Sequence, residues 1–246
     1  MIDLKRPDGS TIKSWEDWTR PKRDYQWKAG RSAVELAKSW FREGQLSTPK
    51  ELVELLQSAP CLKNLWLSQC IPELVTQLPE RGEGRNHDLV LRGQTSTENV
   101  TICIEAKADE PFGADNIREY WNRAIRRRSS GVATRVPERI QALLGLVGDT
   151  SNVPSESPWG DVRYQLLSAI CGTIRQAELD SSSLAVFVVH EFHTELTRNE
   201  NLVRNHTEFE RLLSVLAFES FKVSPSNLYG PFRINGIDCF IGKAVA

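Results

Sequence analysis

Three residues in the middle of the chain have the types and the spacing of a metal-dependent hydrolytic site. Asp88 lies at the start of one short apolar segment, and Glu105 and Lys107 lie at the end of the next. Two carboxylates, together with carbonyl oxygens and water, are the ligands that Mg²⁺ or Mn²⁺ prefers. Such an ion makes bound water more acidic and stabilises negative charge on a phosphodiester. A lysine beside it can position or deprotonate the attacking water.

An antiparallel pair of strands would bring these three residues together. Residues 88–92 and 100–107 are predicted strands, separated by a turn at 93–99. In the second segment the even positions are apolar and the odd positions polar, so Glu105 and Lys107 share the polar face. Because the ends of antiparallel neighbours lie side by side, Asp88 should approach Glu105. A cross-strand salt bridge at a sheet edge would explain the same residues without any chemistry.

The remaining elements predict a single α/β domain with a mixed central sheet flanked by helices. Helical spacing of apolar residues predicts helices over 32–42, from Pro49 onward, and over 114–129, 137–147, 161–179 and 206–220. A short helical or irregular stretch is expected at 61–70, before an extended segment near 73–78. The apolar run 184–189 predicts a fully buried strand, and Asn235-Gly236 predicts a hairpin turn.

The order of these elements, with Asp88, Glu105 and Lys107, resembles the PD-(D/E)XK nuclease-like superfamily. Its core, helix–three strands–helix–strand, is matched over residues 30–195. A bacterial branch of that superfamily is similar over three shorter segments: Glu105-Ala-Lys-Ala-Asp-Glu-Pro-Phe-Gly113, Leu143-Leu-Gly-Leu146 and Arg163-Tyr-Gln-Leu-Leu167. One departure is that His87, not proline, precedes Asp88. The resemblance implies a restriction-endonuclease-like core with a helical insertion after the catalytic strand. It also implies Mg²⁺- or Mn²⁺-dependent hydrolysis of phosphodiester bonds in nucleic acid, with DNA favoured.

The resemblance also implies roles for four further side chains. Gln165 is expected to contact water or phosphate at the site, and Arg163 beside it to bind phosphate. Glu73 matches an additional upstream acid that would help hold the metal. Glu110, three residues beyond Lys107, is a further metal candidate that could instead cap the next helix. Other upstream acids compete for the role of Glu73, namely Glu35, Glu51 and Glu54.

Basic residues cluster in two segments, although the net charge of −1 excludes a protein coated in basic surface. Residues 114–140 contain seven arginines and three acids, directly after Lys107. This segment is therefore a candidate clamp on a nucleic-acid backbone. A solvated helix face is the commoner explanation of such a cluster. The residues expected to contact phosphate are Arg123, Arg126, Arg127, Arg128 and Arg163. The second cluster comprises Arg20, Lys22, Arg23, Lys28 and Arg31.

The chain is expected to form one domain over residues 1–246. It divides into an N-terminal arm (1–30), a core (30–195) with a helical insertion (111–150), and a C-terminal helix and hairpin (196–246). It has no run of 18 apolar residues, no apolar secretory segment and no Cys-x-x-Cys pair. These features predict a cytoplasmic protein without a membrane segment. A homodimer is left open.

Two non-enzymatic alternatives remain. One is a catalytically silent nuclease-fold protein that binds nucleic acid or a protein partner. The other is a structural or toxin-neutralising interaction protein that uses the aromatic N-terminal arm. An intact set of two acids and a lysine favours the nuclease.

Overall fold

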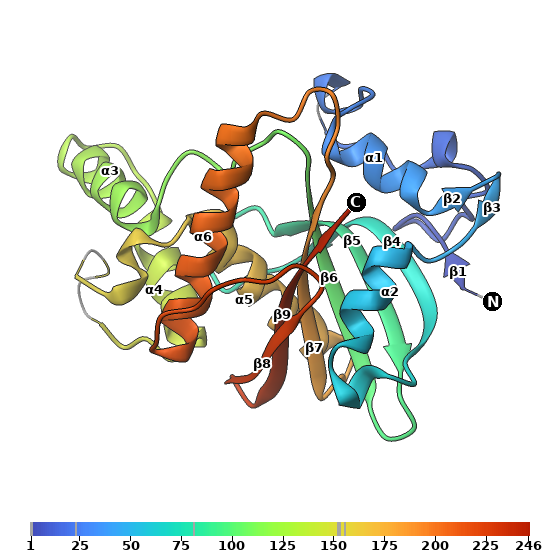
Figure 1. Cartoon of the computed structure of the whole chain (residues 1–246). Coiled ribbons are helices and arrows are strands. Elements are labelled where there is room, and N and C mark those ends of the chain that lie inside the picture. The colour runs from blue at the N-terminus through green and yellow to red at the C-terminus, as the bar shows by residue number, and fades with distance from the viewer. Residues whose placement is uncertain (1, 23, 81, 152–153, 155) are drawn as a thin grey trace.

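A mixed seven-stranded sheet with helices on both faces forms the centre of the protein (Figure 1). The computed structural model describes residues 2–22, 24–80, 82–151, 154 and 156–246. The strands of the sheet, in spatial order, are β1 (Asp3–Leu4), β4 (Trp66–Thr76), β5 (Arg85–Gln94), β6 (Asn99–Lys107), β7 (Leu184–Glu191), β9 (Ile237–Val245) and β8 (Leu228–Ile234). A separate ribbon pairs β2 (Phe41–Arg42) with β3 (Gln45–Leu46). The prediction of a mixed sheet flanked by helices is confirmed.

Among the five central strands, the pairing changes from antiparallel to parallel at β6. Strands β4, β5 and β6 form an antiparallel meander, whereas β6, β7 and β9 are parallel. The hairpin predicted at Asn235-Gly236 joins β8 to β9. At the other edge, the N-terminal arm adds β1 parallel to β4. Strand β6 therefore lies in the interior of the sheet, with a neighbour on each side.

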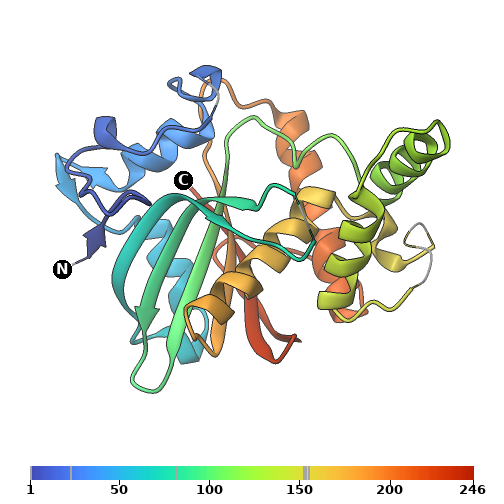
Figure 2. The ribbon, with the colours of Figure 1, turned by 180° about the vertical axis from the view of Figure 1, so that it is seen from behind.

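Helices cover the two faces unequally. On one face, α1 (Ser32–Ser39) and α2 (Lys50–Gln57) pack with the arm against the even residues of β6 and β7. On the other face, α5 (Tyr164–Leu179) crosses the strands, as Figure 2 shows from behind. The remaining helices, α3 (Ile117–Ser129), α4 (Val136–Leu146) and α6 (Asn199–Ala217), extend that second layer. Both faces of β7 are buried, which explains its uninterrupted apolar run.

The structure corrects the sequence prediction in four places. The helix predicted over 32–42 ends at Ser39, and residues 41–42 form strand β2. Residues 66–76 form strand β4, where a helical or irregular stretch was expected up to residue 70. A register shift between Leu67 and Gln69 lets Leu67 and Cys70 enter the same core, so their three-residue spacing imitates a helix. Strand β5 begins at Arg85, so Asp88 lies inside it rather than at its start. Helix α6 begins at Asn199 rather than near 206, because its polar first turns carry little apolar signal.

No helix of the described residues has the length and apolar character needed to cross a membrane.

Candidate functional site

The site begins where β5 and β6 stop pairing with each other. Their paired residues run from Gln94 and Asn99 to Leu89 and Ile104. At the next position the side chain of Asp88 replaces the backbone pairing between the strands: its Oδ2 accepts from the backbone N–H of Ala106 at 2.6 Å. The Asp88 carboxylate is thereby held against β6 at Ala106, the residue that follows Glu105.

Glu105 is surrounded by three donors from three different elements. Its Oε1 accepts from Lys107 Nζ at 2.6 Å and from Gln165 Nε2 at 2.6 Å. Its Oε2 is paired with the guanidinium of Arg85. Lys107 lies beside Glu105 because alternate residues of a strand share a face. Gln165 reaches it from the first turn of α5. The predicted proximity of Asp88, Glu105, Lys107 and Gln165 is therefore present.

The burial of this cluster differs from the sequence interpretation. Glu105 and Lys107 are only 4% and 6% exposed, so the polar face of β6 is covered by α5 rather than open to solvent. These two side chains of the polar face are therefore buried rather than exposed. Close approach of α5 depends on Gly172, where a Cβ would lie 2.7 Å from Cγ of Arg85. The side chain of Arg85 therefore lies between α5 and the sheet, where it pairs with Glu105.

Electrostatics make the two carboxylates unequal. Burial by itself would raise the pKa of Glu105, but Arg85 and Lys107 more than offset that effect and hold its pKa below the usual range. Burial raises the pKa of Asp88 well above its usual range, and repulsion from Glu105 and Glu73 adds to the rise. Glu105 is thus a stabilised anion, whereas Asp88 is a carboxylate whose charge is not fully offset by the chain.

Glu73 and Glu110 occupy different positions around this pair. Glu73 lies in β4 with φ of 55°, and Asn86 donates to its carboxylate. Burial raises the pKa of Glu73, and Glu105 contributes to the rise. Glu110 instead accepts from the backbone N–H groups of Ala108 and Asp109, at 3.0 and 3.1 Å. Glu73 therefore belongs to the charged cluster, whereas Glu110 caps the turn after β6 and not the following helix.

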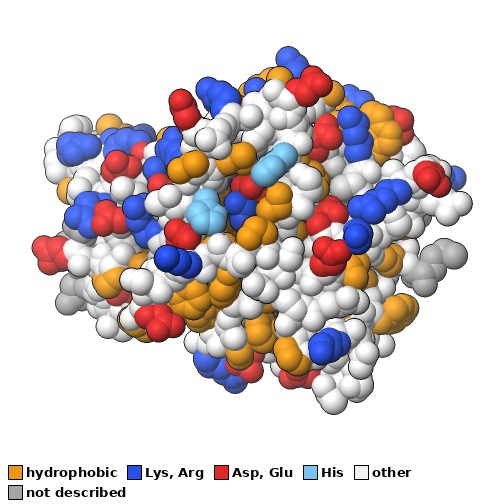
Figure 3. Space-filling model, in the orientation of Figure 1, with side chains coloured by type: hydrophobic (Ala, Val, Ile, Leu, Met, Phe, Trp, Pro, Cys, Tyr) orange, Lys and Arg blue, Asp and Glu red, His pale blue; other side chains and the backbone are white. Residues whose placement is uncertain are grey.

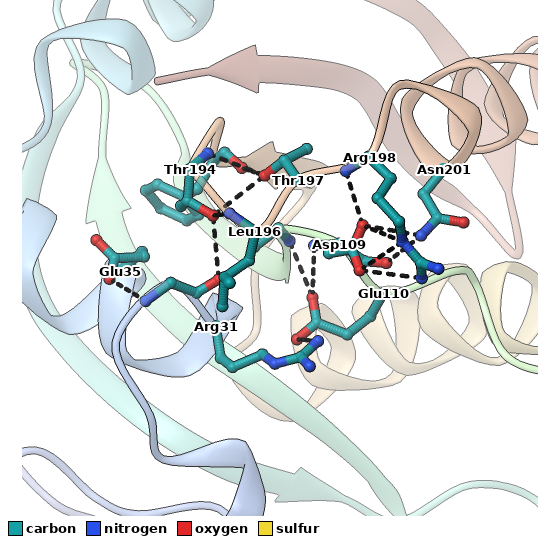
Figure 4. A network of polar contacts seen from close by, with 12 residues as sticks. Arg31, Glu35, Asp109, Glu110, Thr194, Leu196, Thr197, Arg198 and Asn201 are labelled. Carbon is teal, nitrogen blue, oxygen red and sulfur yellow. Dashed lines mark hydrogen bonds and ion pairs between the residues drawn. The ribbon is translucent and has the colours of Figure 1, made fainter.

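Polar contacts fix this turn to the N-terminal arm and to the start of α6 (Figure 4). The Asp109 carboxylate accepts from the backbone and side chain of Arg198 and from Asn201 Nδ2 at 2.9 Å. Arg31 from the arm lies 3.9 Å from Glu110. The network holds the end of β6, and with it Lys107, in a defined position.

Two cavities meet at the carboxylates. The larger, of about 1010 Å³, lies between the arm, the turn after β6 and α6, and both Lys22 and Arg31 of the arm line it. Arg23, from the same basic cluster, is outside the described residues. The smaller cavity, of about 580 Å³, lies toward α3, α4 and α5. Asp88, Glu105 and Gln165 line both cavities, so these three side chains stand where the two join.

The donor set fits a hard divalent ion held by two carboxylates and water. Within the described residues, no group of three or more His, Cys, Asp and Glu side chains is arranged to hold a metal. Mg²⁺ is commonly bound through one or two carboxylates and several waters, so a larger group is not required. Oδ1 of Asp88 has no hydrogen-bond partner among the described residues. This oxygen and Oε1 or Oε2 of Glu105 are the atoms that could hold such an ion.

The arginines named from the sequence lie apart from both cavities. Arg123 pairs with Asp115 and Arg128 with Glu138. Arg126 and Arg127 are exposed near the end of α3 and have no ion pair among the described residues. Over α3, at the left of Figure 3, basic side chains alternate with acidic ones.

Arg163 is held inside the protein. Its guanidinium bonds to Glu208 at 2.9 Å and to the carbonyl of Ala114 at 3.0 Å, and its side chain is 14% exposed. A role for Arg163 in phosphate binding stays a prediction.

Sequence reasoning named Lys22, Arg31 and Lys107 but did not single out four other basic groups that line the cavities. Arg85 was overlooked because β5 was expected to start at Asp88. Arg135 and Arg139 line the smaller cavity, and Arg204 lines the larger. The first two belong to the arginine-rich segment, but only the fold separates them from the arginines of α3.

The comparisons with known proteins identify a family. The model of a domain of unknown function (DUF6946) matches residues 10–246, and the chain belongs to this family. No curated protein and no solved structure matches the chain.

Proposed function

We propose that this member of the DUF6946 family is a metal-dependent nuclease with a PD-(D/E)XK-type site, which hydrolyses phosphodiester bonds of nucleic acid, with DNA favoured. The observation that carries the proposal is the meeting of Asp88 and Glu105 at the junction of two cavities, with Lys107 bonded to Glu105 beside them. Two carboxylates that can hold a divalent ion and an ammonium beside them are the groups this chemistry needs.

The order of the elements supports the proposal. Helices α1 and α2 precede the meander β4–β5–β6, and α5 then leads to β7, which is parallel to β6. This order agrees with the helix–three strands–helix–strand order that the resemblance implies. Helices α3 and α4 would then be the insertion after the catalytic strand.

Each residue has a distinct task in this mechanism. Asp88 and Glu105 would hold Mg²⁺ or Mn²⁺, which supplies an acidic bound water and stabilises charge on the phosphate. Lys107, 2.6 Å from Glu105, positions the attacking water and offsets developing negative charge. Gln165 fixes the orientation of the Glu105 carboxylate. Arg85 keeps that carboxylate ionised. Glu73 would contact the ion through a water molecule.

One observation favours a second candidate, a silent nuclease-fold protein that binds without cleaving. Both oxygens of Glu105 already have partners within the chain, in Lys107, Gln165 and Arg85. A site that had lost its metal would hold a buried carboxylate in the same way.

Cleavage assays separate the two candidates. The purified protein is incubated with single-stranded and duplex DNA and RNA, with Mg²⁺ or Mn²⁺ and with EDTA. We expect cleavage that requires the ion and is abolished in Asp88→Asn. The matched control is Asp180→Asn, because Asp180 is a hydrogen-bonded, largely buried aspartate at the other end of α5. Cleavage that persists in Asp88→Asn would contradict the proposal, and absence of cleavage with every substrate would favour the silent protein.

A further inference from the structure

We infer that the smaller cavity is a binding site for an unpaired nucleotide, and hence that the substrate is a single-stranded nucleic acid. This inference deepens the proposed function and rests on it, because the scissile phosphodiester is taken to lie at Asp88 and Glu105. Three independent features of the cavity carry it: its depth, its aromatic wall and its uncommitted arginines.

The reacting groups lie at the bottom of a recess. The side chains of Glu105, Lys107 and Arg85 are exposed by only 5%, 7% and 11%. A duplex carries its phosphates on the outside of a stiff rod, with a persistence length of about 150 base pairs. A single strand is flexible enough to place one phosphate at the recessed carboxylates and its neighbouring nucleotides in the two cavities.

The wall of the smaller cavity is aromatic. Tyr120 of α3 and Tyr164 of α5 both line it, with ring centroids 4.7 Å apart and planes inclined at 64°. Val136 and Leu78 add apolar surface beside them. Aromatic side chains next to a basic groove bind unpaired bases by stacking, without much regard to base identity. The pair therefore suits a nucleobase adjacent to the scissile phosphate.

Two arginines of this cavity have charge available for phosphate. Arg135 is exposed and forms no ion pair among the described residues. Arg139 donates to the carbonyl of Glu83 and bonds to the ring hydroxyl of Tyr164, and in the described part of the chain it forms no ion pair and its buried Nε has no hydrogen-bond partner. By contrast, Arg128 of α3 is already paired with a carboxylate, and Arg126 and Arg127, which form no ion pair among the described residues, line neither cavity. Arg135 and Arg139 are therefore better placed than the α3 arginines to bind the substrate backbone.

Binding in EDTA tests the inference without any cleavage. Labelled thymidine and uridine oligonucleotides of equal length, and a duplex of the same length, are titrated with the protein. We expect at least about tenfold tighter binding of the single strands than of the duplex. Tyr120→Leu should weaken single-strand binding at least about fivefold, since a stacked base is lost, whereas Tyr120→Phe should not. The two oligonucleotide types show whether the strand is DNA, RNA or either.

The arginine variants give an independent measurement at an exposed position, where folding is not at risk. Arg135→Ala should lower the slope of log affinity against log salt by about 0.7, the value for one phosphate contact on a single strand. Arg127→Ala is the matched control and should leave the slope unchanged, because Arg127 is also exposed but lines neither cavity.

The outcomes separate this inference from the proposed function. Equal affinity for duplex and single strand, or a folded Tyr120→Leu that binds like wild type, would overturn the inference. An effect of Arg127→Ala as large as that of Arg135→Ala would do the same and would favour a clamp on α3. Metal-dependent cleavage without strand preference would leave the nuclease proposal intact, whereas single-strand binding without any cleavage would refute hydrolysis and retain the nucleotide site.

Discussion

Replacing Lys107 by methionine should both abolish cleavage and destabilise the fold, and the structure allows the two effects to be separated. Methionine keeps most of the side-chain volume but removes the ammonium that lies 2.6 Å from Glu105. Removing one partner of a buried ion pair costs about 3–5 kcal/mol, because the other charge stays buried. Glu105 retains Arg85 and Gln165, so we expect a loss near ~3 kcal/mol. For a chain of this size that corresponds to a decrease in Tm of roughly 6–12 °C.

A second buried pair provides the matched control. Lys243 Nζ lies 2.7 Å from Glu191, with side-chain exposures of 5% and 4%, against 7% and 5% for Lys107 and Glu105. Glu191 also keeps another partner, His193, when the lysine is removed. Lys243→Met should therefore lower Tm by a similar amount, but it should leave cleavage intact because neither cavity includes Lys243.

The assay combines thermal unfolding in EDTA with cleavage measured well below both transitions. We expect similar Tm values for the two variants and a loss of cleavage, by about 100-fold or more, in Lys107→Met alone. An unchanged Tm in Lys107→Met would refute the argument that this ion pair stabilises the fold. Loss of cleavage in both variants would show that activity reports stability rather than chemistry at Lys107.

Two further predictions concern Asp88. The Asp88 carboxyl has a raised pKa in the folded protein. As the pH rises above the usual pKa of an aspartate, the folded protein therefore loses stability relative to the unfolded chain. Asp88→Asn keeps the acceptor for the Ala106 N–H. In metal-free solution near neutral pH the variant should have a higher Tm than wild type, and this difference in Tm should disappear in acid. A difference in Tm that does not depend on pH would contradict this cause. Mn²⁺ at about 100 times its Kd should add about 2.7 kcal/mol to the stability of wild type, and Tm measured for Asp88→Asn should not change on addition of the ion.

The parts of the fold that follow from local periodicity could be predicted from the sequence. Strand β6 alternates strictly and β7 is continuously apolar, and both were located correctly. Strand β4 could not be, because its register shift and Pro72 break the period of two. Beyond Cys70, the last residue paired with the arm, no strand of the described residues pairs with that side of β4, so Pro72 and the positive φ of Glu73 are tolerated there.

Part of the candidate site also follows from local sequence patterns, and part depends on how the elements pack. The proximity of Glu105 and Lys107 follows from strand period, and that of Asp88 from antiparallel pairing. The partners of Glu105 from outside the hairpin depend on how α5 packs, which no local pattern encodes. The distinction between Arg135 and Arg127 depends on the angle between α3 and α4, although both residues belong to one arginine-rich segment.

The position of the site in an interior strand explains why its charges are unevenly balanced. Because β6 has neighbours on both sides and helices on both faces, any charged group at its end must be buried. Buried charges are tolerated when paired, and Glu105 meets that requirement through Lys107 and Arg85. With Glu73 included, three carboxylates face two cations, and the deficit falls on Asp88 and Glu73, whose pKa values are both raised. A fold stabilised only by its own side chains would gain by replacing Asp88 with a neutral acceptor, whereas the proposed metal ion would offset the charge of this aspartate.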